Sequence, residues 1–324
     1  MRRLTVLTIL VALAGCGDAE GGFLDRYVSG DGRVVRHDQG GDTVSEGQAY
    51  AMLLAVAHDD EERFERVWTW TREHLRRGDG LLSWRWADGR VADPEPAADA
   101  DLDAARALIL AGERFGDPRY EQEGRALGRA IAEHETAVAA DKTVLVAGPW
   151  ARERGALNPS YWSPRAFAAL GMEEVAASAR RLTDRLTEDG LPPDWAKVEP
   201  YGVFPAPSPS GGEPMYSYDA ARVPIRYAES CRPEDRKLAA RLWASLQHEP
   251  GAAKRALDGR PLSGDESPVA LAGAAASAHA AGDDRAAREL LDRAAQLDAE
   301  HPSYYGSALV ELTRAVMDGA LGRC

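Results

Sequence analysis

The chain has 324 residues, a hydrophobic fraction of 44% and a formal net charge of -13. This length and composition predict a globular protein with a sizeable core and exclude a disordered chain. The negative charge disfavours a nucleic-acid partner, because phosphate binding requires clustered Lys and Arg. The seven histidines are scattered, without His-Glu-x-x-His or Cys-x-x-Cys motifs, so the sequence predicts no metal and no cofactor. We expect a monomer.

The N-terminus, MRRLTVLTILVALAGC, joins two arginines to a short apolar run. The run is too short to span a bilayer permanently. Its end, Leu13 to Cys16, resembles a bacterial lipobox. We therefore expect a lipoprotein signal peptide over residues 1–16, a lipid on Cys16, a tether over residues 17–22 and a single domain over residues 23–324. A conventional signal peptide cleaved elsewhere is the alternative.

Two further cysteines, Cys231 and Cys324, lie near or at the end of the chain. A lipoprotein at the bacterial envelope, on its periplasmic or outer-surface side, is in a compartment where disulfides form. The sequence leaves open whether these two cysteines pair or stay free.

Apolar spacing predicts helices along almost the whole chain. We expect a short helix over 23–28 and then helices over 43–58, 60–77, 99–115, 117–134, 163–170, 172–188, 218–230, 233–248, 266–281, 283–297 and 303–320. Only LLSWRW at 81–86 and TVLVAG at 143–148 have strand patterns, which predict short hairpins within loops. Pro224 should interrupt helix 218–230, because proline lacks an amide and clashes with the preceding turn.

Neighbouring predicted helices differ in their polarity. Residues 44–57 are apolar nearly all round, whereas 61–77 carry apolar side chains on a charged background, and the contrast returns between 268–281 and 283–297. Twelve helices in six such pairs predict an all-α fold, an (α/α)6 barrel of six inner and six outer helices. The alternative is a helical-repeat scaffold, because residues 281–305 resemble one tetratricopeptide unit. No such period is sustained upstream, and long loops would interrupt a regular stack.

Three acidic residues, Glu46, Asp99 and Asp219, lie at the starts of helices expected in the inner layer. Inner helices of such a barrel run parallel, so these carboxylates would meet on one rim. Acids at helix N-termini also complement the helix dipole, and Ser45 to Gln48 fits a capping box. Hydrolysis of a glycosidic bond, however, requires one protonated and one ionised carboxyl group. Burial, with Tyr50 nearby, is expected to keep Glu46 protonated.

Aromatic residues accompany the three acids. Flat rings suit sugar rings, although Trp and Tyr also serve as packing residues. The candidate substrate-binding residues are Trp84, Trp86, Tyr161, Trp162, Tyr218 and Tyr50, together with Arg222, which follows Asp219 by three positions. Arg222 could instead form a surface ion pair.

Five segments resemble glycoside hydrolase family 8 in the same chain order: SEGQAYAMLLAVA, LLSWRW, AADADLDAARALILAGERF, NPSYWSP and YDAARVPIRYA. Ala98 and Ala104 depart from the family signature, but both of its aspartates remain. The resemblance implies an inverting enzyme with an (α/α)6 barrel. It also implies that Glu46 is the general acid, that Asp219 is the general base, and that Asp99 assists the central sugar subsite. Arg222 would orient the base or a sugar hydroxyl.

The resemblance implies endo-acting hydrolysis of a β-1,4-linked polysaccharide such as a cellulose-like glucan. Location at the envelope further suggests an exopolysaccharide substrate and its synthesis or secretion machinery as a partner. Xylan and chitosan remain open as substrates, and so does a non-catalytic carbohydrate-binding lipoprotein. A polysaccharide lyase is disfavoured, because the acidic chain suits uronic acids poorly.

Overall fold

The computed structural model describes residues 21–139, 142–322 and 324. The predicted signal peptide, Cys16 and most of the tether lie outside these residues. Within them there are twelve α-helices: α1 (Phe23–Tyr27), α2 (Ser45–Ala57), α3 (Glu61–His74), α4 (Ala98–Phe115), α5 (Pro118–His134), α6 (Pro164–Leu170), α7 (Glu173–Leu186), α8 (Arg222–Ala228), α9 (Pro233–Leu246), α10 (Pro268–Ala280), α11 (Asp284–Glu300) and α12 (Tyr304–Met317). Each predicted helix is present.

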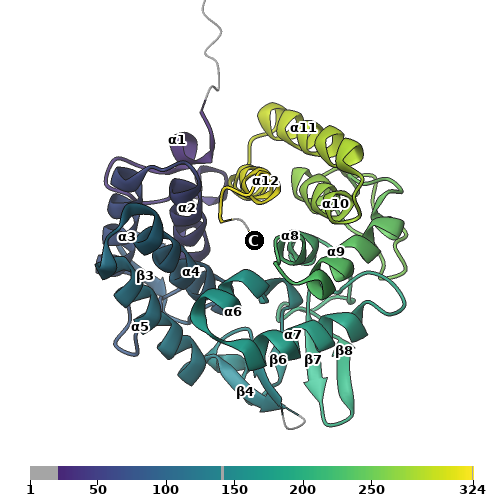
Figure 1. The fold of residues 1–324 in the computed structure, drawn as a ribbon, viewed down its shortest axis with the longest axis horizontal. Helices are drawn as coiled ribbons and strands as arrows, with labels where there is room; N and C mark the ends of the chain where they lie inside the picture. The colour runs from purple at the N-terminus through teal and green to yellow at the C-terminus, as the bar shows by residue number, and fades with distance from the viewer. Residues whose placement is uncertain (1–20, 140–141, 323) are drawn as a thin grey trace, which may run out of the picture.

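The even-numbered helices form an inner ring, and the odd-numbered helices lie around it (Figure 1). Each inner helix contacts the next, and α12 contacts both α10 and α2, which closes the ring. The inner helices α2 and α10 are buried along nearly their whole length, whereas the outer helices α7 and α11 bury one face. The predicted (α/α)6 barrel is therefore confirmed, and the repeat scaffold is not.

Small residues allow the helices to approach closely. A Cβ at Gly273 of α10 would lie 2.5 Å from the carbonyl oxygen of Ala221, just before α8. A Cβ at Gly124 of α5 would lie 2.8 Å from the carbonyl oxygen of Ala105 in α4. Both distances are shorter than van der Waals contact, so glycine sets the spacing between these elements.

The described strands form three small antiparallel sheets. They consist of β1 (Thr43–Val44), β2 (Arg85–Ala87) and β3 (Arg90–Asp93), of β4 (Thr136–Ala139) and β5 (Lys142–Leu145), and of β6 (Ala156–Leu157), β7 (Ala196–Glu199) and β8 (Gly202–Pro205). The predicted strands overlap β2 and β5. The hairpin β7–β8 lies in a stretch where no strand was expected, because each strand has only four residues.

The connections differ between the two ends of the barrel. Those leading from an inner helix to the next outer helix have two to four residues: 58–60, 116–117, 171–172, 229–232 and 281–283. Those leading back to an inner helix are much longer, except 301–303, and span 28–44, 75–97, 135–163, 187–221 and 247–267. We call the N-terminal end of the inner helices the loop end and the opposite end the turn end. Long loops on a rigid scaffold commonly carry function.

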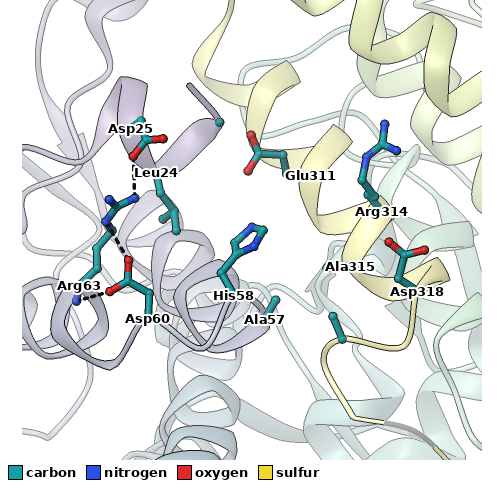
Figure 2. Close-up of a pocket in the computed structure, with 12 residues that line it drawn as sticks. Leu24, Asp25, Ala57, His58, Asp60, Arg63, Glu311, Arg314, Ala315 and Asp318 are labelled. Atoms are coloured by element: carbon teal, nitrogen blue, oxygen red, sulfur yellow. Dashed lines mark hydrogen bonds and ion pairs between the residues drawn. The ribbon is translucent and has the colours of Figure 1, made fainter. Parts of the chain in front are cut away.

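The turn end holds a disulfide and a cavity. Cys231 and Cys324 are joined, with a Cα–Cα distance of 5.3 Å, so the pairing left open by the sequence is present. A cavity of about 610 Å³ lies between α1, α2 and α12 (Figure 2). Beside it, Arg63 forms ion pairs with Asp25 at 2.9 Å and with Asp60 at 3.3 Å. Among the described residues, no helix is both long and apolar enough to cross a membrane.

Candidate active site

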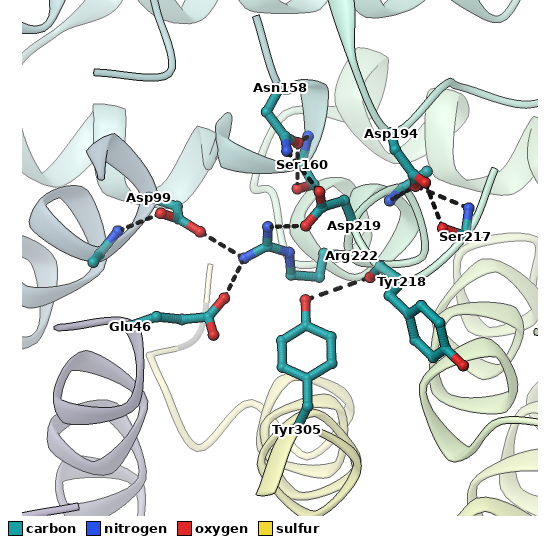
Figure 3. A network of polar contacts seen from close by, with 12 residues as sticks. Glu46, Asp99, Asn158, Ser160, Asp194, Ser217, Tyr218, Asp219, Arg222 and Tyr305 are labelled. Carbon is teal, nitrogen blue, oxygen red and sulfur yellow. Dashed lines mark hydrogen bonds and ion pairs between the residues drawn. The ribbon is translucent and has the colours of Figure 1, made fainter. Parts of the chain in front are cut away.

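The three predicted acids meet at the loop end on one guanidinium group (Figure 3). Glu46 is in the first turn of α2, Asp99 is in the first turn of α4, and Asp219 lies in the turn before α8. Nη1 of Arg222 donates to Glu46 at 2.9 Å and to Asp99 at 2.7 Å, and its Nη2 donates to Asp219 at 2.9 Å. Residues that are far apart in sequence thus share a single cation.

The start of α8 places Asp219 and Arg222 correctly for this contact. The helix begins at Arg222, so Pro224 lies in its first turn, where an amide would have no helical partner. The expected interruption by Pro224 is therefore confirmed, and Asp219 lies on irregular backbone just before the helix.

Arg222 is the central charge of the site and is only 2% exposed. Burial lowers the pKa of its guanidinium, but the tyrosines and carboxylates around it outweigh burial and hold the pKa well above its usual value. The side chain therefore stays charged. The alternative of a surface ion pair is wrong for this residue.

The pKa of Glu46 is raised close to neutrality. Burial raises its pKa to about 7, Arg222 opposes that rise, and Asp99 adds to it. The hydroxyl of Tyr50, one turn along α2, donates to Oε1 at 3.1 Å, and that of Tyr304 donates to Oε2 at 3.3 Å. A Cβ at position 47 would lie 2.7 Å from the Tyr304 hydroxyl, so Gly47 gives Tyr304 access to Glu46. Glu46 is therefore poised to hold and release a proton near neutral pH.

The predicted capping box around Glu46 is wrong. The N-cap of α2 is Val44, and no side chain caps this end. The side chain of Gln48 instead accepts from the amide of Val34 at 2.6 Å and donates to the hydroxyl of Thr71 at 2.8 Å. Gln48 therefore ties the chain before α2 to α3, because both groups are buried and need partners.

Asp219 is held by two different donors. Oδ1 accepts from Arg222, and Oδ2 accepts from Nδ2 of Asn158 at 2.9 Å. The amide of Asn158 is itself oriented, because its Oδ1 accepts from the amide of Ser160 at 3.1 Å and from its hydroxyl at 2.7 Å. Burial raises the pKa of Asp219 above its usual value. Arg222 and the bond from Asn158 oppose this rise, and the charge of Asp194 adds to it.

Asp194 supports the turn that carries Asp219. Its Oδ1 accepts from the amides of Ser217 and Ala220, both at 2.8 Å, and its Oδ2 accepts from the hydroxyl of Ser217. These bonds fix the backbone on both sides of Asp219 (Figure 3). Asp194 does not touch Asp219 through a hydrogen bond, so it acts as a positioning residue.

Asp99 is almost fully buried. Its Oδ1 accepts from the amide of Ala100 at 2.9 Å, and its Oδ2 accepts from Arg222. Burial is the largest influence on Asp99 and raises its pKa, with Arg222 acting against it. Loss of solvent therefore has a larger effect on the pKa of Asp99 than the neighbouring cation has.

Three further tyrosines lie around Arg222 and the cavity beside it. The ring centroids of Tyr161 and Tyr305 lie 5.3 and 6.0 Å from the guanidinium carbon of Arg222. Tyr218 is 46% exposed, and its carbonyl accepts from the hydroxyl of Tyr305 at 3.4 Å. A cavity of about 540 Å³ adjoins Tyr218 and Tyr305. Tyr305 thus lies between Arg222 and this cavity, which Tyr218 also lines.

The other predicted sugar-binding rings are buried or half-buried. Trp162 is buried and its Nε1 donates to the carbonyl of Leu145 at 3.1 Å, so the structure places it in the core rather than on the site. Tyr50 is also buried and contacts Glu46, so it offers no ring face to a substrate. Trp84 and Trp86 are half-buried, and Trp86 packs edge-on against Trp70.

The site also contains residues that were not predicted as members. Asn158 lies within NPSYWSP, the segment that also contains the predicted residues Tyr161 and Trp162, and this was a usable signal. Tyr304 and Tyr305 begin α12, and their pairing was a usable signal. Asp194 lies 23 residues before Ser217 in a loop, and nothing in the sequence connects the two.

A buried acid with a pKa near neutrality, a second carboxylate held by separate donors and a border of aromatic rings form the arrangement of a carboxylate-dependent glycoside hydrolase. The family model described as "Glycosyl hydrolases family 8" matches residues 3–317. The chain belongs to glycosyl hydrolase family 8.

Two curated relatives illustrate the family. The chain is 34% identical over 221 residues to a "Probable endoglucanase" of Novacetimonas hansenii. The aligned segment covers 63% of this chain and 64% of that protein. The chain is 30% identical over 243 residues to an "Endoglucanase" of Cellulomonas uda, covering 68% of this chain and 66% of that protein. These matches span just under two thirds of the relatives' own length.

Solved structures share the fold over a longer range. The endo-beta-1,4-glucanase CMCax from Acetobacter xylinum has a TM-score of 0.75 and 28% identity, with 92% of this chain and 96% of that chain covered. An endoglucanase from Komagataeibacter sucrofermentans has a TM-score of 0.73 and 28% identity, with 91% and 95% covered.

Proposed function

We propose that this protein is an inverting, endo-acting hydrolase of a β-1,4-linked polysaccharide such as a cellulose-like glucan. The observation that carries the proposal is the single guanidinium of Arg222 shared by Glu46, Asp99 and Asp219. One cation cannot neutralise the three carboxylates that gather around it, so at least one of them favours its protonated form. The endoglucanases among the relatives support the substrate class.

In this mechanism Glu46 donates its proton to the glycosidic oxygen as the bond to the anomeric carbon breaks. Asp219 removes a proton from a water molecule that attacks the anomeric carbon from the opposite face. The proton lost by Glu46 and the proton gained by Asp219 balance, so exchange with solvent restores both groups. The bonds from Arg222 and Asn158 favour the ionised form of Asp219 against the effect of burial, and Asp99 helps to keep Glu46 protonated by raising its pKa.

The variants Glu46→Gln and Asp219→Asn test these roles. Each should lower kcat by roughly 100- to 10,000-fold, the usual contribution of a general acid or base, while the fold is retained. Glu311→Gln is the matched control, because Glu311 is a carboxyl group at the turn end whose pKa is also raised by burial. Turnover like that of the wild type in either active-site variant would refute the assignment.

The substrate and the stereochemistry can be measured together. Carboxymethyl cellulose, lichenan, xylan and chitosan form the substrate panel, with reducing ends and viscosity followed in parallel. An endo-acting enzyme lowers viscosity before many ends appear. NMR of the first products should show the α-anomer, as inversion at a β-linkage requires. A β-anomer would establish retention instead. Cleavage of xylan or chitosan alone would identify that polymer, and not a glucan, as the substrate.

We also propose that a lipid on Cys16 anchors the protein at the cell envelope, where it trims a secreted exopolysaccharide beside the synthesis or secretion machinery. The lipobox-like segment that ends at Cys16 supports this location. In fractionation, the wild type should sediment with membranes and Cys16→Ser should not. Recovery of the wild type in the cytoplasm would refute the proposal.

A further inference from the structure

The β7–β8 hairpin presents aromatic rings to solvent. Tyr201, at its tip, is 94% exposed, and Phe204 on β8 is 48% exposed. Large apolar side chains with such exposure are uncommon enough to call for an explanation when they gather on one element. The hairpin extends beyond α7 at the edge of the barrel (Figure 1).

The register of the hairpin assigns its two faces. Lys197 lies opposite Phe204, and Val198 lies opposite Val203. Directly opposed residues share a face, and faces alternate along each strand. The face with Val198 and Val203 is half-buried and packs against the core, whereas Phe204 and Lys197 lie on the solvent face.

Trp195, which is half-buried and also packs against the core, continues this face toward the active site. Its carbonyl accepts from the amide of Ala206, which continues the ladder by one pair, so Trp195 lies on the same face as Lys197 and Phe204. The ring of Trp195 lies 6.2 Å from that of Tyr161, the residue whose ring lies over Arg222. Rings therefore follow one another from Arg222 through Tyr161 and Trp195 to Phe204.

We infer that the solvent face of the β7–β8 hairpin is a second binding surface for the polysaccharide, holding the part of the chain that extends beyond the active site. The strand from Trp195 to Tyr201 covers roughly 20 Å at about 3.3 Å per residue, enough for several sugar rings. The exposed rings offer flat apolar faces, and the Lys197–Glu199 ion pair at 3.1 Å offers polar groups to sugar hydroxyls. This inference rests on the proposed function, because it assumes a polysaccharide in the active site.

The double variant Tyr201→Ala and Phe204→Ala tests this surface with two substrates. With carboxymethyl cellulose, which is long enough to reach the hairpin tip, kcat/KM should fall roughly tenfold through KM, since two aromatic contacts are lost. With cellotriose as a short substrate, kcat/KM should not change. Val138→Ala is the matched control, because Val138 is 77% exposed on the neighbouring β4–β5 hairpin, and it should alter neither rate.

Binding without turnover separates this inference from the proposed function. The Glu46→Gln variant should be retarded in affinity electrophoresis through carboxymethyl cellulose, and adding the two hairpin substitutions should remove most of the retardation. Equal retardation of both proteins, or an equal loss of kcat/KM on both substrates, would overturn the binding surface. A wild type that binds the polymer through the hairpin but cleaves no substrate would overturn the proposed function alone.

Discussion

The charged groups at the two ends of the barrel differ in their burial and in their ratio of acids to arginines. At the turn end, Arg63 forms ion pairs with Asp25 and Asp60, which are partly exposed beside a cavity (Figure 2). At the loop end, one buried arginine faces three carboxylates (Figure 3). Solvent screens the ion pairs at the turn end, whereas Arg222 and Asp99 at the loop end are almost fully buried, which strengthens their interaction.

This difference shows where a barrel of this kind can place reactive groups. Short connections at the turn end leave little chain with which to cover a charge. The long connections at the loop end bring Asn158, Asp194 and Tyr161 against groups at the starts of inner helices. An excess of buried acid over base then keeps a carboxyl group protonated near neutral pH, which a glycosidase needs.

Substitution of the arginine at each end should give the largest difference in kcat and in stability between the two ends. Arg222→Met should lower kcat roughly 100- to 1,000-fold and cost about 3–5 kcal/mol of unfolding free energy, because it leaves buried carboxylates without their cation. Arg63→Met should cost less than about 1 kcal/mol and leave kcat unchanged. Urea unfolding and initial rates measure both. Equal losses of kcat and of unfolding free energy in the two variants would contradict the proposed difference between the two ends.

Asp194 should have the next largest effect. Asp194→Ala removes the hydrogen bonds that hold the turn around Asp219, and a small displacement of the base should lower kcat roughly 10- to 100-fold. Asp194→Asn should rescue most of this loss, because one oxygen accepts both backbone amides. Asp60→Ala removes a comparable cap at the turn end and should leave kcat unchanged. A wild-type rate for Asp194→Ala would contradict the positioning role.

The pH profile should reveal Glu46. A general acid works only while protonated, so kcat/KM should fall above about pH 7 and approach a tenfold loss per further pH unit. Asp99→Asn removes a charge that raises the pKa of Glu46, so the alkaline limb should move to lower pH. Glu311→Gln at the turn end should not move it. A limb that stays in place in Asp99→Asn would mean that Asp99 does not influence the acid.

The disulfide should have the smallest effect on activity. Cys231 and Cys324 are separated by 93 positions, so replacing both with Ser should cost roughly 4–5 kcal/mol through the entropy of the unfolded chain. The bond lies at the turn end, away from the carboxylates, so kcat at 25 °C should not change. Thermal melting and initial rates of the double variant provide the comparison. A large fall in kcat in folded protein would show that the two ends are coupled.

Much of the fold followed from local pattern. Helical apolar spacing located the inner and outer helices, and Pro224 correctly indicated an irregular approach to α8. The strands β7 and β8 were not predicted, because four residues give too little alternation of apolar and polar side chains to recognise. The capping box at Glu46 was wrong although Ser45 and Gln48 match the local motif, because Gln48 bonds to Val34 and Thr71 and not to the start of α2.

The sequence by itself determined the helical pairing and the identities of the three acids, because periodicity and helix starts are local properties of the chain. Only the tertiary structure decided how those acids share one guanidinium, that Trp162 is a core residue, and that Asp194 supports the turn that carries Asp219. It also decided the balance of pKa values around Glu46. These outcomes depend on burial and on contacts between distant segments, which no local pattern encodes.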